Sequence, residues 1–314
     1  MTERRPLLLL VNPDSGGKPA APGGAAGSGP PEPEGLCDAL RSRGLEVELH
    51  VLAEDDDPGE VAKRAVAEGR DVVAAGGDGT VEPVAAALAR TEATLGILPL
   101  GSWNNFATAA GIPARLDEAL ATVAAGRVAT IDVGLAWRPA DPDAGLDQPP
   151  EDAERFFEAA GVGVDAEWFG AAQLAGRYGL LRALRTGWRI LRRHRTDMRI
   201  LVDGQVTEVE APTAIICNGP YLGMGFAVAP DADVSDGMLN LVVFTGMSRW
   251  AVLRHLVAVA RRRPRPEPRA VPVLARRVVI HGSRRTLPAH VDGRSIGTTP
   301  VAFGVDPGAL RLFR

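Results

Sequence analysis

The chain has 314 residues, of which 46% are hydrophobic and 24% are charged. This composition is that of a water-soluble globular protein with one large or two medium domains, and no apolar run approaches the roughly 20 residues that a membrane-spanning helix needs. The two cysteines, Cys37 and Cys217, lack the spacing of a zinc site or a disulfide framework, so we expect a reducing cytoplasm. Residues 1–150 carry 12 basic and 23 acidic side chains, whereas residues 151–314 carry 23 basic and 16 acidic ones. The net charge of −4 therefore combines −11 and +7, and the second half could face an anionic surface.

The first half alternates strand-like and helix-like segments. We predict strands at residues 6–11, 46–52, 71–75 and 95–98, and helices at 36–43, 58–68, from 80 onward and at 116–125. Asp57 suits the N-cap of the second helix, Gly126 closes the last one, and Pro83 is expected in the first turn of the helix from Thr80. Residues 16–35 are low in complexity and are predicted to form a flexible loop. The β-α-β-α order predicts a parallel sheet covered by helices, with ligands at the carboxyl ends of its strands.

The second half changes to short strands separated by Gly, Pro or Asp, which is typical of an antiparallel sandwich or barrel. These strands are expected at residues 128–137, 155–164, 198–202, 213–217, 238–244, 277–281, 289–291 and 301–305. We therefore predict an α/β protein with a first domain at 1–127 and a mainly antiparallel β-sandwich at 128–314, whose extreme C-terminus could return to the first domain. Residues 138–153 are expected to be a surface insertion.

Two basic helical stretches are predicted inside this second half, at residues 171–195 and 250–263. The first is amphipathic and rich in arginine, so it either packs on its own domain with a solvated face or lies on an anionic bilayer. Aromatic residues do not interleave with the charge run that ends the second, so we expect no nucleic-acid partner.

The segment DVVAAGGDGTVE at 71–82 carries the strongest chemical signal. Gly76, Gly77 and Gly79 let the main chain turn sharply and let a bulky anion approach it. The helix that follows offers unpaired N–H donors and a positive dipole end, which favour phosphate. Asp78 fits beside phosphate only when a divalent cation lies between the two. The segment predicts a metal–polyphosphate site, although an isolated glycine cluster is as often a plain tight turn.

Two other predicted strand ends carry similar residues, VNPDSGG at 11–17 and ILPLGSWNNF at 97–106. Three loops with glycine, hydroxyl and amide groups would then meet at one edge of the sheet, which is how a nucleotide site is assembled.

Acidic turns occur later in the chain. Asp231, Asp233 and Asp236 crowd one loop, which is typical either of an oxygen site for Mg²⁺ or Ca²⁺ or of ordinary turn chemistry. Asp292 and Gly293 by themselves predict a β-hairpin turn.

Taken in order, six segments resemble the bacterial diacylglycerol kinase family, which is related to sphingosine and ceramide kinases. They are NPDSGG at 12–17, GGDGTVE at 76–82, LPLGSWNNFA at 98–107, the run from 119 to 134, PDADVSDGML at 230–239 and VDGRSIGTTP at 291–300. The GGDGT element is shared with NAD kinases and phosphofructokinases, so the later segments carry the specificity. The resemblance implies an ATP-dependent lipid kinase with an N-terminal domain of the NAD kinase and diacylglycerol kinase type and a site in the cleft between two domains.

The same resemblance implies roles for individual residues. Contacts to the nucleotide phosphates or their Mg²⁺ would come from Asn12, Pro13, Ser15, Gly16, Gly76, Gly77, Asp78, Gly79, Thr80, Ser102 and Asn104. Asp236 matches a residue of a structural Mg²⁺ site. Members of the family often pair, so a homodimer is one expectation.

The sequence departs from the family pattern at two positions that the family uses for catalysis or for its Mg²⁺ network. Asn105 stands where the family usually has an aspartate that belongs to the Mg²⁺ network, and Arg294 stands where it usually has a glutamate, a supposed general base. Arginine stays protonated and cannot act as a base. Glu82 could restore one nearby charge.

Two hypotheses follow, and a third is weaker. In an active lipid kinase, Asp78 or Asp292 would deprotonate the substrate hydroxyl and Arg294 would neutralise phosphate, since phosphoryl transfer depends mostly on positioning and charge. Alternatively the chain binds nucleotide or lipid without transfer, and an NAD kinase would explain GGDGT but not the later segments. Apolar side chains of the second domain would either bind the lipid or form ordinary core; they are Trp168, Phe169, Tyr221, Leu222, Met224 and Phe226. We expect a cytoplasmic protein that associates peripherally with the inner face of an anionic membrane.

Overall fold

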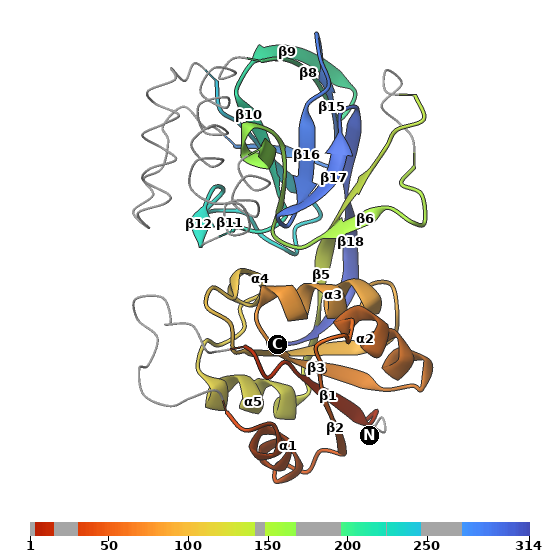
Figure 1. Cartoon of the computed structure of the whole chain (residues 1–314), viewed down its shortest axis with the longest axis vertical. Coiled ribbons are helices and arrows are strands. Elements are labelled where there is room, and N and C mark those ends of the chain that lie inside the picture. Colours follow the sequence, from red (N-terminus) through yellow and green to blue (C-terminus); the bar gives the residue numbers. More distant parts are fainter. Residues whose placement is uncertain (1–3, 16–30, 142–147, 168–195, 224, 246–271) are drawn as a thin grey trace. The chain divides into compact units, whose positions relative to one another are not determined.

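The computed structural model describes residues 4–15, 31–141, 148–167, 196–223, 225–245 and 272–314 (Figure 1). The chain forms two compact units. Unit 1 consists of Met1–Val133 with Pro307–Arg314, and unit 2 consists of Gly134–Asp306. The chain passes from one unit to the other within two strands, β5 (Val128–Trp137) and β18 (Val301–Phe313).

Unit 1 contains the predicted parallel sheet. Its strand order is β2 (Val47–Val51), β1 (Leu7–Val11), β3 (Asp71–Gly76) and β4 (Thr94–Pro99), and the end of β18 joins beside β4, also in parallel. Every residue of the central strands β1 and β3 is buried, because helices cover both faces of the sheet. In Figure 1, α2 (Pro58–Ala67), α3 (Asp78–Leu88) and the short α4 (Asn105–Ala109) lie on one face, and α1 (Pro33–Arg41) and α5 (Leu116–Ala125) lie on the other.

Local sequence explains where most of these helices begin and end. The carboxylate of Asp57 accepts the N–H groups of Gly59 and Glu60 and so caps α2 as expected, while Gly126 ends α5 in the left-handed conformation. Two predictions need correction. Helix α1 begins at Pro33, inside the segment expected to be a loop. Helix α3 begins at Asp78 rather than Thr80, because Gly77 is extended and serves as its N-cap, so Pro83 lies beyond the first turn.

Unit 2 is antiparallel. One sheet has the order β14 (Pro272–Ala275), β13 (Leu239–Val243), β10 (Thr213–Cys217), β7 (Ala159–Gly163), β16 (Pro288–Val291) and β17 (Arg294–Thr298). In the other, the start of β18 pairs with β15 (Arg277–Gly282), which pairs with β8 (Asp197–Val202), and β8 pairs with β9 (Gln205–Glu210). Side chains from both sheets, such as Ile216 and Ile280, share one buried apolar cluster, so this unit is the predicted sandwich.

Several strands differ from the expectation. The single strand predicted at 155–164 is two strands, β6 (Glu154–Phe156) and β7, separated by a turn at Phe157 and Glu158. Strand β18 continues far beyond residue 305. The structure adds β9, β14, β17 and a small hairpin of β11 (Tyr221–Leu222) and β12 (Phe226–Ala227).

The two predicted basic helices, at 171–195 and 250–263, lie outside the described residues. Among the residues that are described, no helix combines the length and the apolarity that crossing a bilayer requires.

Candidate functional site

Two strand ends of unit 1 meet through a direct side-chain contact. The amide Nδ2 of Asn12, just after β1, donates to Oγ1 of Thr80 in the first turn of α3 at 2.9 Å. The backbone N–H of Asn12 donates to the carbonyl of Ala75 at the end of β3, and its side-chain oxygen accepts the N–H of Asp14. Asn12 therefore holds the loop at residues 12–15, which contains Pro13 and Ser15, against the Gly76–Thr80 turn. Gly16 lies outside the described residues.

The third strand end packs on the same turn, backbone against backbone. A Cβ on Gly101 would come within 2.4 Å of the Cα of Gly77, so neither position has room for a side chain. The side chain of Asn104 closes this loop with two hydrogen bonds. Its Oδ1 accepts the N–H of Gly101 and its Nδ2 donates to the Gly101 carbonyl, each at 2.9 Å. Asn104 is itself left-handed, with φ 51°. Ser102 lies within this loop. The Asn12–Thr80 hydrogen bond and the Gly77–Gly101 contact thus bring together the three loops that the sequence singled out.

The carboxylate of Asp78 lies at the start of α4. Its Oδ1 accepts the N–H of Phe106 at 3.3 Å. Burial raises the pKa of Asp78 above its ordinary value, and neighbouring backbone N–H groups, chiefly that of Asn105, offset the increase only in part. A bound divalent cation would favour the ionised carboxylate. Asn105 is buried at the first position of α4 and supplies an amide without charge.

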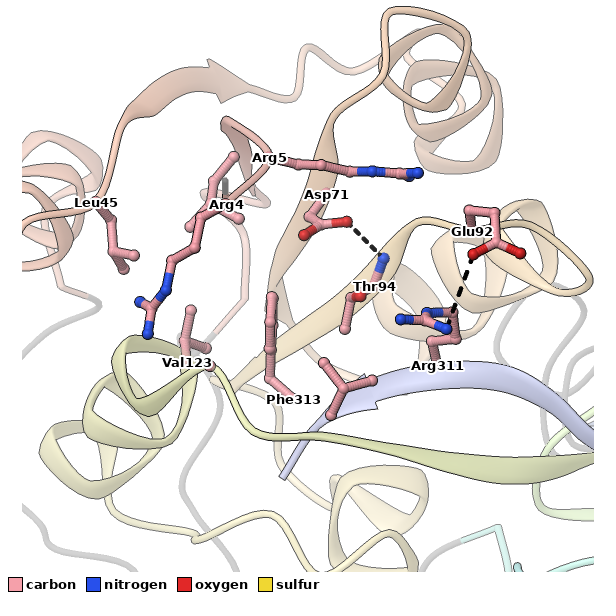
Figure 2. A pocket seen from close by; sticks show the side chains of 12 residues that line it. Arg4, Arg5, Leu45, Asp71, Glu92, Thr94, Val123, Arg311 and Phe313 are labelled. Atoms are coloured by element: carbon pink, nitrogen blue, oxygen red, sulfur yellow. Dashed lines mark hydrogen bonds and ion pairs between the residues drawn. The ribbon is translucent and has the colours of Figure 1, made fainter. Parts of the chain in front are cut away.

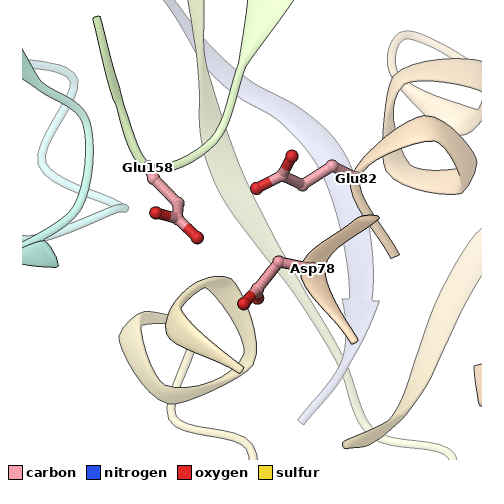
Figure 3. A group of neighbouring side chains, drawn as sticks. All are labelled: Asp78, Glu82 and Glu158. Atoms are coloured by element: carbon pink, nitrogen blue, oxygen red, sulfur yellow. The ribbon is translucent and has the colours of Figure 1, made fainter. Parts of the chain in front are cut away.

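A second carboxylate follows Asp78 one turn along α3. Glu82 is four residues further on, so both side chains project from one side of the helix start (Figure 3). The N-terminus of α3, with Gly79 and Thr80 in its first turn, also presents backbone N–H groups. Unit 1 thus combines two oxygen ligands suited to Mg²⁺ with donors suited to phosphate.

In unit 2, Asp292 holds a neighbouring turn in place. It lies in the β16–β17 hairpin turn, where Asp292 and Gly293 both have positive φ, as this sequence pair predicts. Its carboxylate accepts three backbone N–H groups, from Phe157 at 2.8 Å, Glu158 at 3.0 Å and Ala159 at 3.1 Å. Burial nevertheless raises its pKa to about 6.

The guanidinium of Arg294 lies beside β6, where its Nη2 donates to the carbonyl of Arg155 at 3.4 Å. Its guanidinium is 3.7 Å from the carboxylate of Glu154, and its side chain is 61% exposed. Its positive charge lowers the pKa of Asp292 and so acts against the effect of burial. The proposed role of Arg294 toward phosphate stays a prediction.

Glu158, in the turn that Asp292 holds, is a candidate that the sequence analysis missed. It is 7% exposed, and its Oε2 accepts the N–H of Gly223 at 3.1 Å. Figure 3 shows its carboxylate at the tip of the β6–β7 turn. Gly223 directly follows β11, whose Tyr221 and Leu222 are among the predicted lipid-binding residues. The sequence signal was present but weak: one glutamate interrupts an otherwise apolar strand pattern.

The remaining predicted residues are those of the acidic loop and the apolar candidates for lipid binding. The carboxylates of Asp233 and Asp236 accept the N–H groups of Ser235 and Met238, two residues further along, which is ordinary turn bonding. The metal role of Asp236 stays a prediction. Leu222 and Phe226 belong to a buried apolar cluster of unit 2, whereas Trp168, Phe169 and Met224 lie outside the described residues.

Known proteins resemble the chain over most of its length. A family model described as "Diacylglycerol kinase catalytic domain" matches residues 6–136, and one described as "YegS C-terminal NAD kinase beta sandwich-like domain" matches residues 160–314. A "Probable lipid kinase YegS-like" of Cronobacter sakazakii (strain ATCC BAA-894) is 32% identical, with 68% of this chain and 69% of that protein aligned. A "Probable lipid kinase YegS" of Escherichia fergusonii is 33% identical, with 66% and 67% aligned.

A solved structure shows the same fold. The crystal structure of a diacylglycerol kinase from Bacillus anthracis str. Sterne covers 100% of this chain and 98% of its own, with a TM-score of 0.68 and 20% identity.

Proposed function

Because the chain belongs to the YegS-like family of lipid kinases, we propose that it transfers the γ-phosphate of ATP to a hydroxyl group of diacylglycerol or a similar lipid. The observation that carries this proposal is the meeting of three loops around the start of α3, through the Asn12–Thr80 hydrogen bond and the Gly77–Gly101 contact. Such a turn binds a triphosphate through backbone N–H groups rather than through a specific side chain.

Magnesium is the cofactor that these residues suit. Asp78 and Glu82 supply two carboxylates at the start of α3, and the buried Asp78 would gain a compensating charge from a cation. A bound Mg²⁺ would neutralise charge on the phosphates during transfer. Asn105 removes one negative charge from this region relative to the pattern of the family, and we propose that Glu82 supplies the replacement.

The proton of the acceptor hydroxyl needs a base, and unit 2 offers two carboxylates. Asp292 is held by three backbone N–H groups, which suits it to fixing the β6–β7 turn. Glu158 lies on that turn and bonds the segment beside Leu222, where a lipid would be bound. We therefore assign the base to Glu158 and give Asp292 the task of positioning it, while Asp292 or Asp78 as the base remain the alternatives.

The second candidate function is binding without transfer. Asn105 and Arg294, which replace two acidic residues of the resembled pattern, are the observations that favour it. An NAD kinase is a weaker alternative, since the aligned relatives are named lipid kinases.

The test is a transfer assay with γ-labelled ATP and Mg²⁺, using diacylglycerol, a sphingoid base, an isoprenoid alcohol and NAD as separate acceptors. We expect label in a lipid and none in NAD. Asp78→Asn should lower the transfer rate by about 100-fold or more, because it removes the buried carboxylate that would hold the cation.

Asp117→Asn is the matched control, because it removes the same charge from an exposed ion pair on α5. Full activity of Asp78→Asn would refute the role assigned to that residue. Binding of Mg·ATP without label in any lipid would support the second candidate, and label in NAD would support the third.

A further inference from the structure

A pocket of about 340 Å³ lies in unit 1 at the edge of the sheet opposite the three loops that meet at the start of α3 (Figure 2). It forms at the amino ends of β1, β3 and β4, where Leu7 pairs with Asp71 and Thr94 pairs with Arg311 of β18. The loops described above follow the carboxyl ends of the same strands. The pocket is therefore separate from the proposed nucleotide site.

Apolar side chains line the part of the pocket between the sheet and α5. Gly96 has no side chain, and a Cβ there would meet Val123 of α5 at 3.0 Å and Phe313 of β18 at 3.4 Å. In Figure 2, Val123 and Phe313 lie below Asp71, and Leu45 lies beside Arg4. This lining suits a small apolar body, and the volume is at the lower end of the range for small-molecule sites.

Three arginines surround this lining, and two of them have capacity to bind a ligand. Arg4 is occupied, because it donates to the carbonyls of Ala124 and Ala125 at the end of α5. Arg5 is exposed and forms no hydrogen bond or ion pair with any residue that the structure describes. Arg311 approaches Glu92 at only 3.9 Å, and its buried Nε has no hydrogen-bond partner among the described residues.

Acidic groups offset these charges only in part. Asp71 is buried and accepts the N–H of Thr94 at 2.7 Å. Burial raises the pKa of Asp71 above its ordinary value, whereas the N–H of Thr94 and the charges of Arg5 and Arg311 act in the opposite direction. The side chain of Glu92 is 81% exposed and can turn into solvent. The net charge of the side chains that line the pocket is therefore positive.

We propose that this pocket binds a phosphomonoester with a short apolar body, held by the guanidinium groups of Arg5 and Arg311, with the apolar part against Val123 and Phe313. A guanidinium presents paired N–H donors that match phosphate oxygens. Both a lipid phosphate and a water-soluble phosphate ester carry this chemistry.

The test is calorimetric titration of the full chain in saturating Mg·ATP, so that the proposed nucleotide site is filled. The probes are phenyl phosphate, inorganic phosphate, benzyl alcohol and dihexanoyl phosphatidic acid below its micelle concentration. We expect phenyl phosphate to bind at least about tenfold more tightly than inorganic phosphate, because it also buries apolar surface, and benzyl alcohol not to bind. If dihexanoyl phosphatidic acid binds more tightly than phenyl phosphate, the natural ligand is a lipid phosphate. If phenyl phosphate binds more tightly, the natural ligand is a water-soluble phosphate ester.

Arg5→Gln and Arg311→Gln should each weaken the binding of phenyl phosphate by about tenfold or more, since each removes a charged donor. Arg5 is exposed, so its variant stays informative if Arg311→Gln fails to fold. Arg284→Gln, which removes an exposed arginine of unit 2, is the control and should bind as the unaltered chain does. No binding of either phosphomonoester in the presence of Mg·ATP, or equal binding by Arg5→Gln, would overturn the proposal.

Discussion

At the scale of single residues, Asp292 couples stability to pH. Its pKa is about 6 in the folded chain and 3.8 as an ordinary aspartate, so the folded state holds the proton more tightly than the unfolded state. As pH rises from about 4 to about 6, the unfolded state loses this proton first, and the free energy of unfolding falls. Above about pH 6 both states are ionised and the effect levels off.

We therefore expect the free energy of unfolding to fall, relative to that of Asp292→Asn, by no more than about 3 kcal/mol between pH 4 and pH 6. Urea unfolding at a series of pH values would measure the difference. Arg294→Gln removes a nearby positive charge that lowers this pKa, so it should move the window to higher pH. A difference between the two chains that is flat with pH would show that Asp292 does not titrate in this window.

The Glu158 carboxylate gives a prediction about catalysis. If Glu158 accepts the proton of the lipid hydroxyl, Glu158→Gln should lower kcat by about 100-fold or more and leave KM for ATP nearly unchanged, because we propose that unit 1 binds the nucleotide. Glu208→Gln, on the exposed strand β9, is the matched control. Normal kcat in Glu158→Gln would return the role of the base to Asp78 or Asp292.

At the scale of elements, the contact between two loops sets a steric requirement. Gly101→Ala would place a Cβ 2.4 Å from the Cα of Gly77 and 2.7 Å from Oδ1 of Asn104. The loops would have to separate, and we expect a loss of about 1–3 kcal/mol in the free energy of unfolding together with weaker binding of Mg·ATP.

Gly35→Ala is the control for this change. Gly35 lies in α1 with no atom within 4 Å of an added Cβ, so alanine should stabilise the chain by about 0.5–1 kcal/mol. Denaturant unfolding and nucleotide titration of both variants separate the two cases. Equal stability of Gly101→Ala and the unaltered chain would mean that the two loops are not in contact in solution.

Elements that local chemistry determines were predictable from the sequence. The cap at Asp57, the left-handed end at Gly126 and the buried strand before the glycine turn all follow from neighbouring residues. The order of these elements was enough to predict the parallel sheet and the meeting of its strand ends. The later series of short strands was likewise enough to predict the sandwich, which the family model and the solved structure confirm.

Elements that depend on distant contacts were not predictable. The break between β6 and β7 is held by Asp292, more than 130 residues away, and its one local sign is the glutamate that interrupts an apolar run. Strand β9 has the sequence QVTEVE and is almost entirely exposed, because it lies at a sheet edge where no apolar face is required. For the same reason Glu158 was missed: its burial is a consequence of the turn that Asp292 fixes.

At the scale of the whole molecule, the distribution of charge is the relevant property. Residues 151–314 carry a net charge of +7, and seven of their arginines lie between residues 177 and 195. That segment lies outside the described residues, so its sequence is the basis for the argument. Each basic side chain near an anionic membrane surface contributes about 1 kcal/mol of attraction, and salt screens it.

We therefore predict that the full chain binds vesicles containing an anionic phospholipid, that binding falls steeply as salt is raised, and that neutral vesicles bind little. Replacing Arg182, Arg185 and Arg189 together by glutamine should weaken binding by about 100-fold, since three such charges contribute about 3 kcal/mol. Replacing Arg43, Arg64 and Arg115 of unit 1 makes the same change in net charge and should have a small effect. Vesicle sedimentation at several salt concentrations measures both, and binding that does not depend on salt, or equal losses in the two triple variants, would assign the attraction to something other than this basic segment.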